Sequence, residues 1–396
     1  MESAVNPLIF NPVAGGNTAL NDQEIVLYAA GDVGPNRENP DTMFQHVTPL
    51  ISQGDIAFCQ LEPALSRRGT PLPQARLAMR ADPAAAGAIR RAGFDVVSFA
   101  SNHCMDWGIE AFFDTLEALR SSGLEPIGVG ANLEEARRPA IIERKETSIA
   151  FLGYNSILPQ GYWAEKQRPG CVPLRAHTLY EQIEHDQPGT PCRIHTFVHR
   201  GDLEAMREDI RRAREQADAV IVSMHCGIHF VPAVIADYQK EAARAAVDAG
   251  ADLVLCHHPH ILKGAEVYRG KAIFYSLANF ALESPFTFDE KAKEKESFRE
   301  IRALSPDWKP EKKSLPPDSY KTILVKCVFS DRRIVRVSFL PIQINDREEP
   351  ELLEAQDPRF KEIVSYMEEI TASQGLATHY RTEGNEVVLI GEEDAS

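Results

Sequence analysis

The chain has 396 residues, of which 43% are hydrophobic and 26% are charged, so it is large enough for a substantial core in one big domain or two. A net charge of -15 and a pI near 5.3 argue against nucleic acid or an anionic membrane surface as the main partner, since both require a basic face. No stretch approaches the roughly 20 apolar residues of a membrane helix, and no secretory signal opens the chain. We therefore expect a cytoplasmic protein without a membrane segment.

Five short apolar runs each end beside a residue that can bind a metal. Runs of four to eight such residues are typical of buried strands, and open α/β sheets bind their ligands beyond the carboxyl ends of strands. The sequence therefore predicts one mouth of one sheet that collects these side chains. The runs are Ile25–Ala30 before Asp32, Asp55–Cys59 before Glu62, Asp95–Ser101 before Asn102 and His103, Ala219–Met224 before His225, and Asp252–Cys256 before His257, His258 and His260.

Helical segments alternate with these strands. Apolar residues from Ile109 to Leu119 recur at helical spacing and stop at a glycine end signal, Gly123. A second helix is predicted over Pro232–Asp248, with Gly250 ending it, and Pro139–Gly153 resembles a β-hairpin. The strand and helix alternation predicts a layered α/β fold.

Residues 1–23 are predicted to be a loose leader, 24–344 the main domain and 345–396 a C-terminal extension. The main domain carries two insertions. One is a long connection at about 155–200 with little periodicity, and the other is an exposed segment at about 284–320 with one short helix. Later elements are a hairpin over Lys321–Phe329 and Ile334–Ile342, a helix over 358–373 and a strand over Glu386–Ile390.

The metal-binding residue types suit a pair of divalent cations. Two ions held about 3.5–4 Å apart need a bridging carboxylate, with His, Asp and Asn in the remaining positions. Glu62 is the best bridge, and the turn forced by Pro259 allows one of the two flanking histidines to serve each ion. The oxygen and nitrogen donors favour manganese, zinc or iron, in one or two sites. The predicted ligands are Asp32, Glu62, Asn102, His225, His258 and His260.

His103 has Asp106 three residues later. A carboxylate beside an imidazole fixes its tautomer and raises its pKa, which suits a proton donor to a leaving group. The alternative is that Asn102 caps the following helix and His103 is a half-buried polar residue.

The motifs in this order resemble the CapA family of poly-gamma-glutamate capsule-biosynthesis proteins, a branch of the calcineurin-like metallophosphoesterase superfamily. The resemblance implies a four-layer αββα sandwich with a dimetal site at the sheet ends. It also implies Asp32 and His260 on one ion, Asn102, His225 and His258 on the other, Glu62 between them, and His103 as general acid oriented by Asp106. The motifs are Gly31-Asp32, Leu61-Glu62, Ser101-Asn102-His103 with Asp106 and Gly108, His225-Cys226-Gly227, His257-His258-Pro259-His260, and Tyr275 to Phe280.

The chain departs from the family pattern at three motifs. Superfamily phosphatases carry Asp-x-His where this chain has Asp32-Val33-Gly34, so the first ion loses a ligand. His229 replaces a carboxylate, and is either an extra ligand or acid/base group or a polar wall residue. Ala278 replaces a glycine, and Asn279 beside it is either a substrate contact or a backbone brace.

Several residues near these motifs are candidates for substrate binding. Arg76 and Arg80 could bind carboxylates or phosphates bidentately, with solvated surface arginines as the alternative. Tyr154, Tyr162 and Trp163 could form an aromatic wall, or could be ordinary core or lid packing.

The sequence predicts a metal-dependent hydrolase in which activated water attacks an amide, such as a gamma-glutamyl or peptide bond, or a phosphoester. Two alternatives stay open. One is a metal-dependent peptide epimerase, a class that the resembled branch includes, in which acid/base groups exchange a proton at an alpha carbon. The other is a non-catalytic accessory protein for capsule polymer. The expected partner is a peptide-like or polyglutamate substrate or a phosphoester, and the sequence leaves the oligomeric state open.

Overall fold

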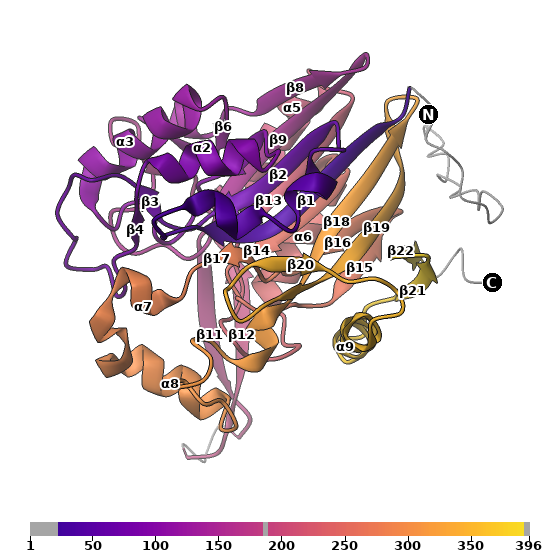
Figure 1. The fold of residues 1–396 in the computed structure, drawn as a ribbon. Helices are drawn as coiled ribbons and strands as arrows, with labels where there is room; N and C mark the ends of the chain where they lie inside the picture. Colours follow the sequence, from indigo (N-terminus) through magenta and orange to yellow (C-terminus); the bar gives the residue numbers. More distant parts are fainter. Residues whose placement is uncertain (1–22, 185–188, 392–396) are drawn as a thin grey trace.

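Two stacked sheets form the centre of the computed structural model (Figure 1), which describes residues 23–184 and 189–391. The predicted leader therefore lies, except for its last residue, outside the described residues. Within the described part of the chain, no helix has the length and apolar composition needed to cross a lipid bilayer.

The larger sheet has ten strands and runs in the order β21-β22-β19-β18-β1-β2-β5-β6, with β17 paired to β1 and β20 to β19. Strands β1, β2, β5 and β6 are mutually parallel, whereas β18 and β19 form the expected antiparallel hairpin. The strands are β1 Ile25–Gly34, β2 Ile56–Leu61, β5 Val96–Ser98, β6 Glu125–Ile127, β17 Asn279–Leu282, β18 Lys321–Ser330, β19 Arg333–Ile344, β20 Pro350–Leu352, β21 Thr378–Glu383 and β22 Glu386–Gly391.

The smaller sheet has six strands in the order β15-β16-β14-β13-β9-β8. Its central strands β9, β13, β14 and β16 are parallel, and β8 and β9 form the expected hairpin, whose tip residues Lys145 and Glu146 have positive φ. The strands are β8 Ala140–Arg144, β9 Thr147–Asn155, β13 Ala219–His225, β14 Leu253–His257, β15 Ala265–Tyr268 and β16 Lys271–Phe274.

Three apolar layers separate the sheets and helices. Between the two sheets, Leu27 and Phe58 of the larger sheet pack with Phe151 and Leu255 of the smaller one. Helices α2 (Ala84–Arg91) and α3 (Gly108–Ser121) cover the outer face of the larger sheet, and α5 (Arg200–Arg214) and α6 (Asp237–Ala249) cover the smaller one. The expected four-layer αββα sandwich is confirmed.

The C-terminal helix and strand are also present. Helix α9 (Pro358–Ala372) buries Phe360 and Met367 in the layer between the sheets, and β22 hydrogen bonds to β19. The remaining short elements are η1 Pro40–Phe44, α1 Thr48–Ile51, β3 Ala64–Leu65, β4 Arg80–Ala81, β7 Val129–Gly130, α4 Leu133–Ala136, β10 Gly170–Cys171, α7 Pro285–Phe288, η2 Glu290–Glu294, α8 Glu296–Leu304 and η3 Pro317–Tyr320.

Three local expectations were wrong. Helix α6 starts at Asp237 and not at Pro232, because Ala233 adopts a left-handed φ of 60° that a helix does not allow. The connection at 155–200 contains a hairpin, β11 (Ala176–Gln182) and β12 (Cys192–Val198), which extends away from both sheets (Figure 1). The later insertion has a four-residue helix, α7, in addition to α8.

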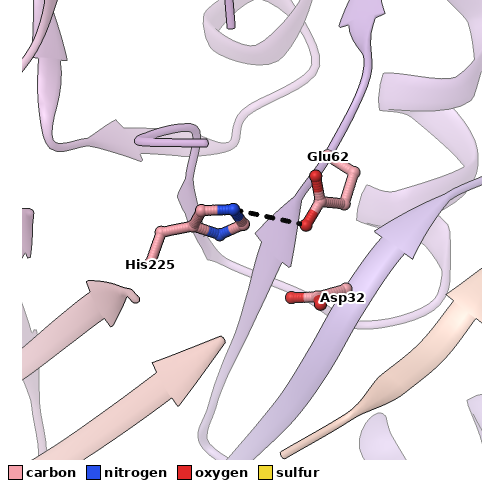
Figure 2. Close-up of side chains that lie close together, drawn as sticks. All are labelled: Asp32, Glu62 and His225. Atoms are coloured by element: carbon pink, nitrogen blue, oxygen red, sulfur yellow. Dashed lines mark ion pairs between the residues drawn. The ribbon is translucent and has the colours of Figure 1, made fainter. Parts of the chain in front are cut away.

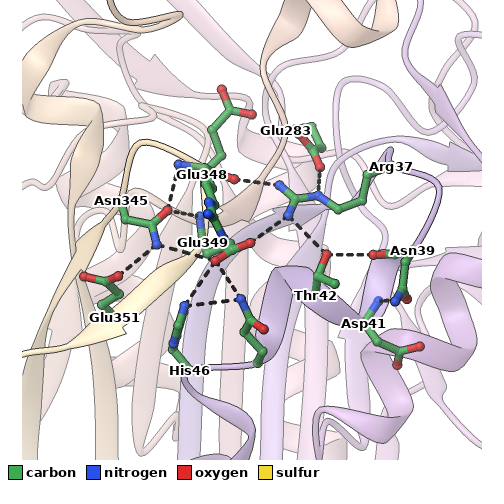
Figure 3. A network of polar contacts seen from close by, with 12 residues as sticks. Arg37, Asn39, Asp41, Thr42, His46, Glu283, Asn345, Glu348, Glu349 and Glu351 are labelled. Atoms are coloured by element: carbon green, nitrogen blue, oxygen red, sulfur yellow. Dashed lines mark hydrogen bonds and ion pairs between the residues drawn. The ribbon is translucent and has the colours of Figure 1, made fainter.

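A polar network fastens the loop after β1 to two later turns (Figure 3). The Arg37 guanidinium pairs with Glu283 and lies 3.2 Å from Glu349 Oε1. Glu349 Oε2 also accepts a hydrogen bond from Gln45 and contacts His46 at 3.1 Å. The network holds together the segments that follow β1, β17 and β19, all of which border the end of the larger sheet where β1 delivers Asp32.

Candidate metal centre

The candidate site lies where strand ends of both sheets meet, and not at the mouth of one sheet as the sequence suggested. The larger sheet supplies Asp32 within β1, Glu62 directly after β2, and Asn102 four residues after β5. The smaller sheet supplies His225 as the last residue of β13, and the turn after β14 supplies His258 and His260. The prediction of one sheet was wrong because local hydrophobic runs do not reveal which strands pair.

Asp32, Glu62 and His225 form the centre of this site (Figure 2). One ligand atom from each lies within 4.8 Å of the others, and all three side chains are fully buried. Glu62 Oε1 and His225 Nε2 lie 3.7 Å apart. Two carboxylates and an imidazole thus face one another in the protein interior.

The backbone is shaped to bring these groups together. A Cβ atom at Gly31 would lie 2.1 Å from the Ala278 carbonyl oxygen, so only glycine allows β1 to approach this turn. Ala278, His258 and His260 have φ values of 62°, 95° and 56°. Non-glycine residues rarely adopt this left-handed region, and such strain concentrates at functional sites.

Asn102 and His258 lie beside His225. Asn102 Oδ1 is 2.7 Å from His225 Nε2 and 3.2 Å from His258 Nδ1. The His225 and His258 rings are 4.9 Å apart between centroids. The three residues that the family resemblance assigns to one ion are therefore brought together.

His260 and Asp32 form the other side of the cluster. His260 Nδ1 lies 3.5 Å from Asp32 Oδ2 and 2.8 Å from Asn279 Oδ1. Asn279 is 1% exposed, so its amide holds the His260 ring from within the protein. This geometry favours the role of Asn279 as a brace over that of a substrate contact.

Several buried polar atoms in this cluster have no hydrogen-bond partner among the described residues. Most buried polar groups in proteins are paired, and an unpaired one costs about 1–3 kcal/mol. Carboxylate oxygens and imidazole nitrogens concentrated in this way fit a divalent transition metal. The unpartnered atoms are Asp32 Oδ1, both oxygens of Glu62, His225 Nδ1, both nitrogens of His257, and His229 Nε2.

Burial shifts the protonation of these groups. Burial, with the nearby charges of Asp32 and Asp106, raises the pKa of Glu62 well above its ordinary value. Burial also lowers the pKa of His225 and of His258 well below the usual value. The two imidazoles are therefore neutral at pH 7, which is the form that binds a metal.

His103 is paired with Asp106 as expected. His103 Nδ1 lies 2.6 Å from Asp106 Oδ2. Asp106 is 1% exposed and accepts two further hydrogen bonds, from the Met79 N–H and from the Tyr162 hydroxyl, each at 2.8 Å. Tyr162 and Tyr154 are both buried, so they pack in the core and neither forms an exposed aromatic wall. The Tyr154 hydroxyl donates to Asp209 at 3.3 Å.

His229 stacks on the site. Its ring centroid lies 3.7 Å from that of His258 and 5.2 Å from that of His260. Burial lowers the pKa of His229 well below its ordinary value, and the nearby basic side chains of His260, His103 and Arg76 add to the shift. A neutral imidazole with an unpartnered Nε2 therefore lies against the metal-binding cluster.

The two candidate arginines are engaged with other groups. Arg76 is exposed, and its guanidinium lies 4.0 Å from Glu300 of α8. The Arg80 guanidinium lies 3.6 Å from the centre of the Trp107 ring and donates to the Arg68 carbonyl. Both residues remain substrate-binding candidates, but Arg80 would have to leave its ring contact to bind an anion.

His257 and Lys263 are two residues whose place in the site the sequence did not predict. His257 is fully buried, with Nδ1 3.4 Å from Asp32 Oδ1. It pairs in register with His225 across β13 and β14, so strand alternation could have placed both rings on one face. Lys263 is 1% exposed, donates to the Val231 carbonyl, and has its pKa lowered to about 8 by burial. No sequence pattern indicates this burial.

Comparison with known proteins places the chain in a family. The PGA biosynthesis protein CapA of Bacillus subtilis (strain 168) is 28% identical over 253 residues, covering 63% of this chain and 59% of that protein. The capsule biosynthesis protein CapA of Bacillus anthracis is 28% identical over 255 residues, covering 64% and 56%. The chain thus spans less than two thirds of the length of these two relatives.

The chain is also similar to a solved structure, that of the calcineurin-like phosphoesterase YfkN from Bacillus subtilis. The two are 12% identical with a TM-score of 0.39, and the match covers 88% of this chain and 97% of that one. A model of the family described as bacterial capsule synthesis protein PGA_cap matches residues 15–284. Because that match spans more than half of the sequence, the chain belongs to the PGA_cap family of bacterial capsule synthesis proteins.

Proposed function

We propose that this protein is a metal-dependent hydrolase of amide or phosphoester bonds. The observation that carries the proposal is the buried cluster of Asp32, Glu62 and His225, whose ligand atoms lie within 4.8 Å of one another. Both Glu62 oxygens lack any hydrogen-bond partner among the described residues. A buried carboxylate in that state is costly for a fold unless a cation accompanies it.

Six side chains would hold one or two divalent ions. Asp32 and His260 would hold one ion, with 3.5 Å between His260 Nδ1 and Asp32 Oδ2. Glu62 would lie between the ions. The second ion would be held by Asn102, His225 and His258, and manganese, zinc or iron fits the donor types of the whole set.

His103 is the proposed general acid. When bound, the divalent ions supply an activated water as nucleophile and polarise the scissile group. Asp106 engages His103 Nδ1 at 2.6 Å, which leaves Nε2 as the ring nitrogen that passes a proton to the leaving group. The buried Asp106 carboxylate also holds the His103 ring in one orientation through this contact.

A peptide-like substrate is favoured over a phosphoester. Two relatives are named as PGA and capsule biosynthesis proteins, which ties those proteins to capsule polymer. We propose a gamma-glutamyl or other peptide amide as the scissile bond in this chain, acted on in the cytoplasm. Arg76 and, once displaced from Trp107, Arg80 would bind substrate carboxylates.

Peptide epimerisation is the second candidate function, and one observation favours it. His229 and His103 are two separate imidazoles beside the same cluster, and the unpartnered Nε2 of His229 is free to exchange a proton. Epimerisation requires two acid/base groups, because one removes a proton from one face of the alpha carbon and the other returns a proton to the opposite face.

One incubation separates these functions. The protein is loaded with manganese, zinc or iron and incubated with gamma-glutamyl peptides, alpha-linked peptides and bis(p-nitrophenyl) phosphate, followed by mass and chiral analysis of the products. Hydrolysis yields products of lower mass, whereas epimerisation yields an unchanged mass with altered chirality. The Glu62→Ala variant is expected to lose turnover and Glu354→Gln, at an exposed glutamate, to keep it. If every substrate keeps its mass and its chirality with every metal, an enzymatic function is contradicted.

A further inference from the structure

Asp106 is a buried carboxylate with an unusual set of partners. It is 1% exposed, yet in the described part of the chain no lysine or arginine lies within ion-pair distance of it. Its Oδ2 contacts His103 Nδ1 at 2.6 Å and accepts the Met79 N–H at 2.8 Å. Its Oδ1 accepts one hydrogen bond, from the Tyr162 hydroxyl at 2.8 Å.

Tyr162 is held rigidly in place for this contact. Its side chain is fully buried in the layer between the larger sheet and α2 and α3. Its N–H donates to the Pro159 carbonyl, and its own carbonyl accepts the Cys171 N–H at 3.0 Å. A Cβ at Gly170 would lie 2.4 Å from the Tyr162 carbonyl oxygen, so glycine alone permits this packing.

The hydroxyl can act only as a donor to Asp106. Burial, together with the negative charge of Asp106, raises the pKa of Tyr162 far above its ordinary value. Tyr162 therefore keeps its proton at neutral pH. Loss of this donor would leave Asp106 Oδ1 buried and unpaired, and only the contacts of Oδ2 with His103 and the Met79 N–H would then orient the carboxylate.

We propose that Tyr162 is a positioning residue for the proton donor His103, acting through Asp106. The inference rests on the proposed function, because it assigns a role to the group that gives the proton. Tyr162 fixes the plane of the Asp106 carboxylate, and Asp106 then keeps the His103 proton on Nδ1 and the ring in one orientation. Tyr162 comes from the connection between β9 and β10, so a segment outside both sheets completes the acid.

The kinetic test compares leaving groups in the metal-loaded full chain. A p-nitrophenolate leaves without needing a proton, whereas an alkoxide or amine does need one. The Tyr162→Phe variant is expected to lose kcat about 10–100-fold on an alkyl phosphodiester or a gamma-glutamyl amide. With bis(p-nitrophenyl) phosphate it is expected to keep kcat, and KM stays unchanged throughout. An equal loss on both kinds of substrate, or no loss on the poor leaving group, overturns the proposal.

Tyr154→Phe is the matched control. Tyr154 is also a buried tyrosine, and its hydroxyl donates to Asp209 at 3.3 Å on the outer side of the smaller sheet. Tyr154→Phe is expected to leave kcat unchanged on both kinds of substrate. A selective loss on the poor leaving group in Tyr154→Phe would mean that the effect does not come from Asp106.

A second measurement does not depend on turnover. In protein labelled with ¹⁵N-histidine, the proton between His103 Nδ1 and Asp106 is expected to give a strongly downfield resonance, identified by its loss in His103→Gln. Tyr162→Phe should move or broaden it, and Tyr154→Phe should not. If wild-type protein has no hydrolytic activity, the proposed function fails while this resonance still tests Tyr162. An unchanged resonance in Tyr162→Phe overturns the positioning role.

If Tyr162→Phe fails to fold, 3-fluorotyrosine placed at position 162 replaces it. The fluorinated ring keeps the shape and the hydroxyl but donates a stronger hydrogen bond. The downfield resonance of His103 is then expected to shift, and a resonance identical to that of the unmodified protein overturns the proposal.

Discussion

Glu62 is the residue that depends most on a bound cation. Both of its oxygens are buried without a hydrogen-bond partner among the described residues, and its pKa is raised by burial and by two neighbouring carboxylates. A ligand that binds only the folded state stabilises it by about 2.7 kcal/mol at a hundredfold excess over Kd. Burial and the neighbouring carboxylates make the ionised form of Glu62 unfavourable until a metal binds beside it.

Metal binding should depend on the negative charge of Glu62. Glu62→Gln removes the charge that a cation needs but keeps the shape of the side chain. After treatment with a chelator, manganese or zinc is expected to raise the melting temperature of the wild-type protein by several degrees and that of Glu62→Gln by little or nothing. Differential scanning calorimetry measures both, with the exposed Glu354→Gln as control. Equal metal-induced shifts in wild type and Glu62→Gln would remove Glu62 from the site.

His103 should separate catalysis from metal binding. His103→Ala is expected to retain the metal content of wild type, because its ring is engaged with Asp106 and not with the ligand cluster. Turnover is expected to fall about 10²–10⁴-fold, the usual contribution of general acid catalysis. Steady-state kinetics combined with metal analysis checks both parts, and full activity in His103→Ala would mean that another group gives the proton.

At the scale of elements, the close approach of β1 to the turn before β17 positions Asp32. The Asp32 N–H donates to the Ala278 carbonyl at 3.0 Å, and Gly31 is the residue that makes room for this contact. Gly31→Ala forces the backbone apart at a cost of about 1–3 kcal/mol. We expect a lower melting temperature together with weaker metal binding, both measured by calorimetry. Gly189→Ala is the control, because among the described residues no atom apart from those of its chain neighbours lies within 4 Å of the added carbon.

The turn after β19 gives a prediction about pH. Burial raises the pKa of Glu348 to about 7, from an ordinary value near 4.5. Between these two values the folded state binds more protons than the unfolded state, so Glu348 lowers the stability progressively as pH rises through this window.

Glu348→Gln removes that penalty. We expect it to be more stable than wild type at pH 8, by about 1–2 kcal/mol after allowance for solvent screening, and to gain nothing at pH 5. Its side chain can still accept one of the bonds from the Ser314 hydroxyl and the Ser284 N–H. Urea unfolding at the two pH values measures the difference, and a Glu348→Gln protein less stable than wild type at pH 8 contradicts it.

Elements with strong local patterns were predictable. The runs around β1, β2, β13 and β14 are fully buried strands, as continuous apolar sequences indicate. The hairpin of β11 and β12 was missed because β11 is exposed on both faces along its length and so lacks any apolar alternation. Helix α6 was predicted too early because residues 232–236 share the composition of the helix but not its backbone conformation.

At the scale of the whole molecule, the sequence predicted which residues follow strands but not how the strands are arranged. Asp32, Glu62 and Asn102 come from one sheet and His225 from the other, and strand pairing decides that they meet. The contact of Tyr162 with Asp106 and the burial of Lys263 depend on packing between distant segments. No local sequence signal encodes such contacts, whereas the family resemblance had already implied the two-sheet sandwich.

Elemental analysis of the purified full chain tests the central claim most directly. The protein is treated with a chelator, incubated with manganese, zinc or iron, and freed of unbound ions before measurement. We predict between one and two ions per chain in wild type and in His379→Gln, a change at an exposed strand residue, and a clear loss in His225→Gln. A wild-type protein that retains no ion with any of these metals, or a His225→Gln variant that retains as many, would contradict the metal centre.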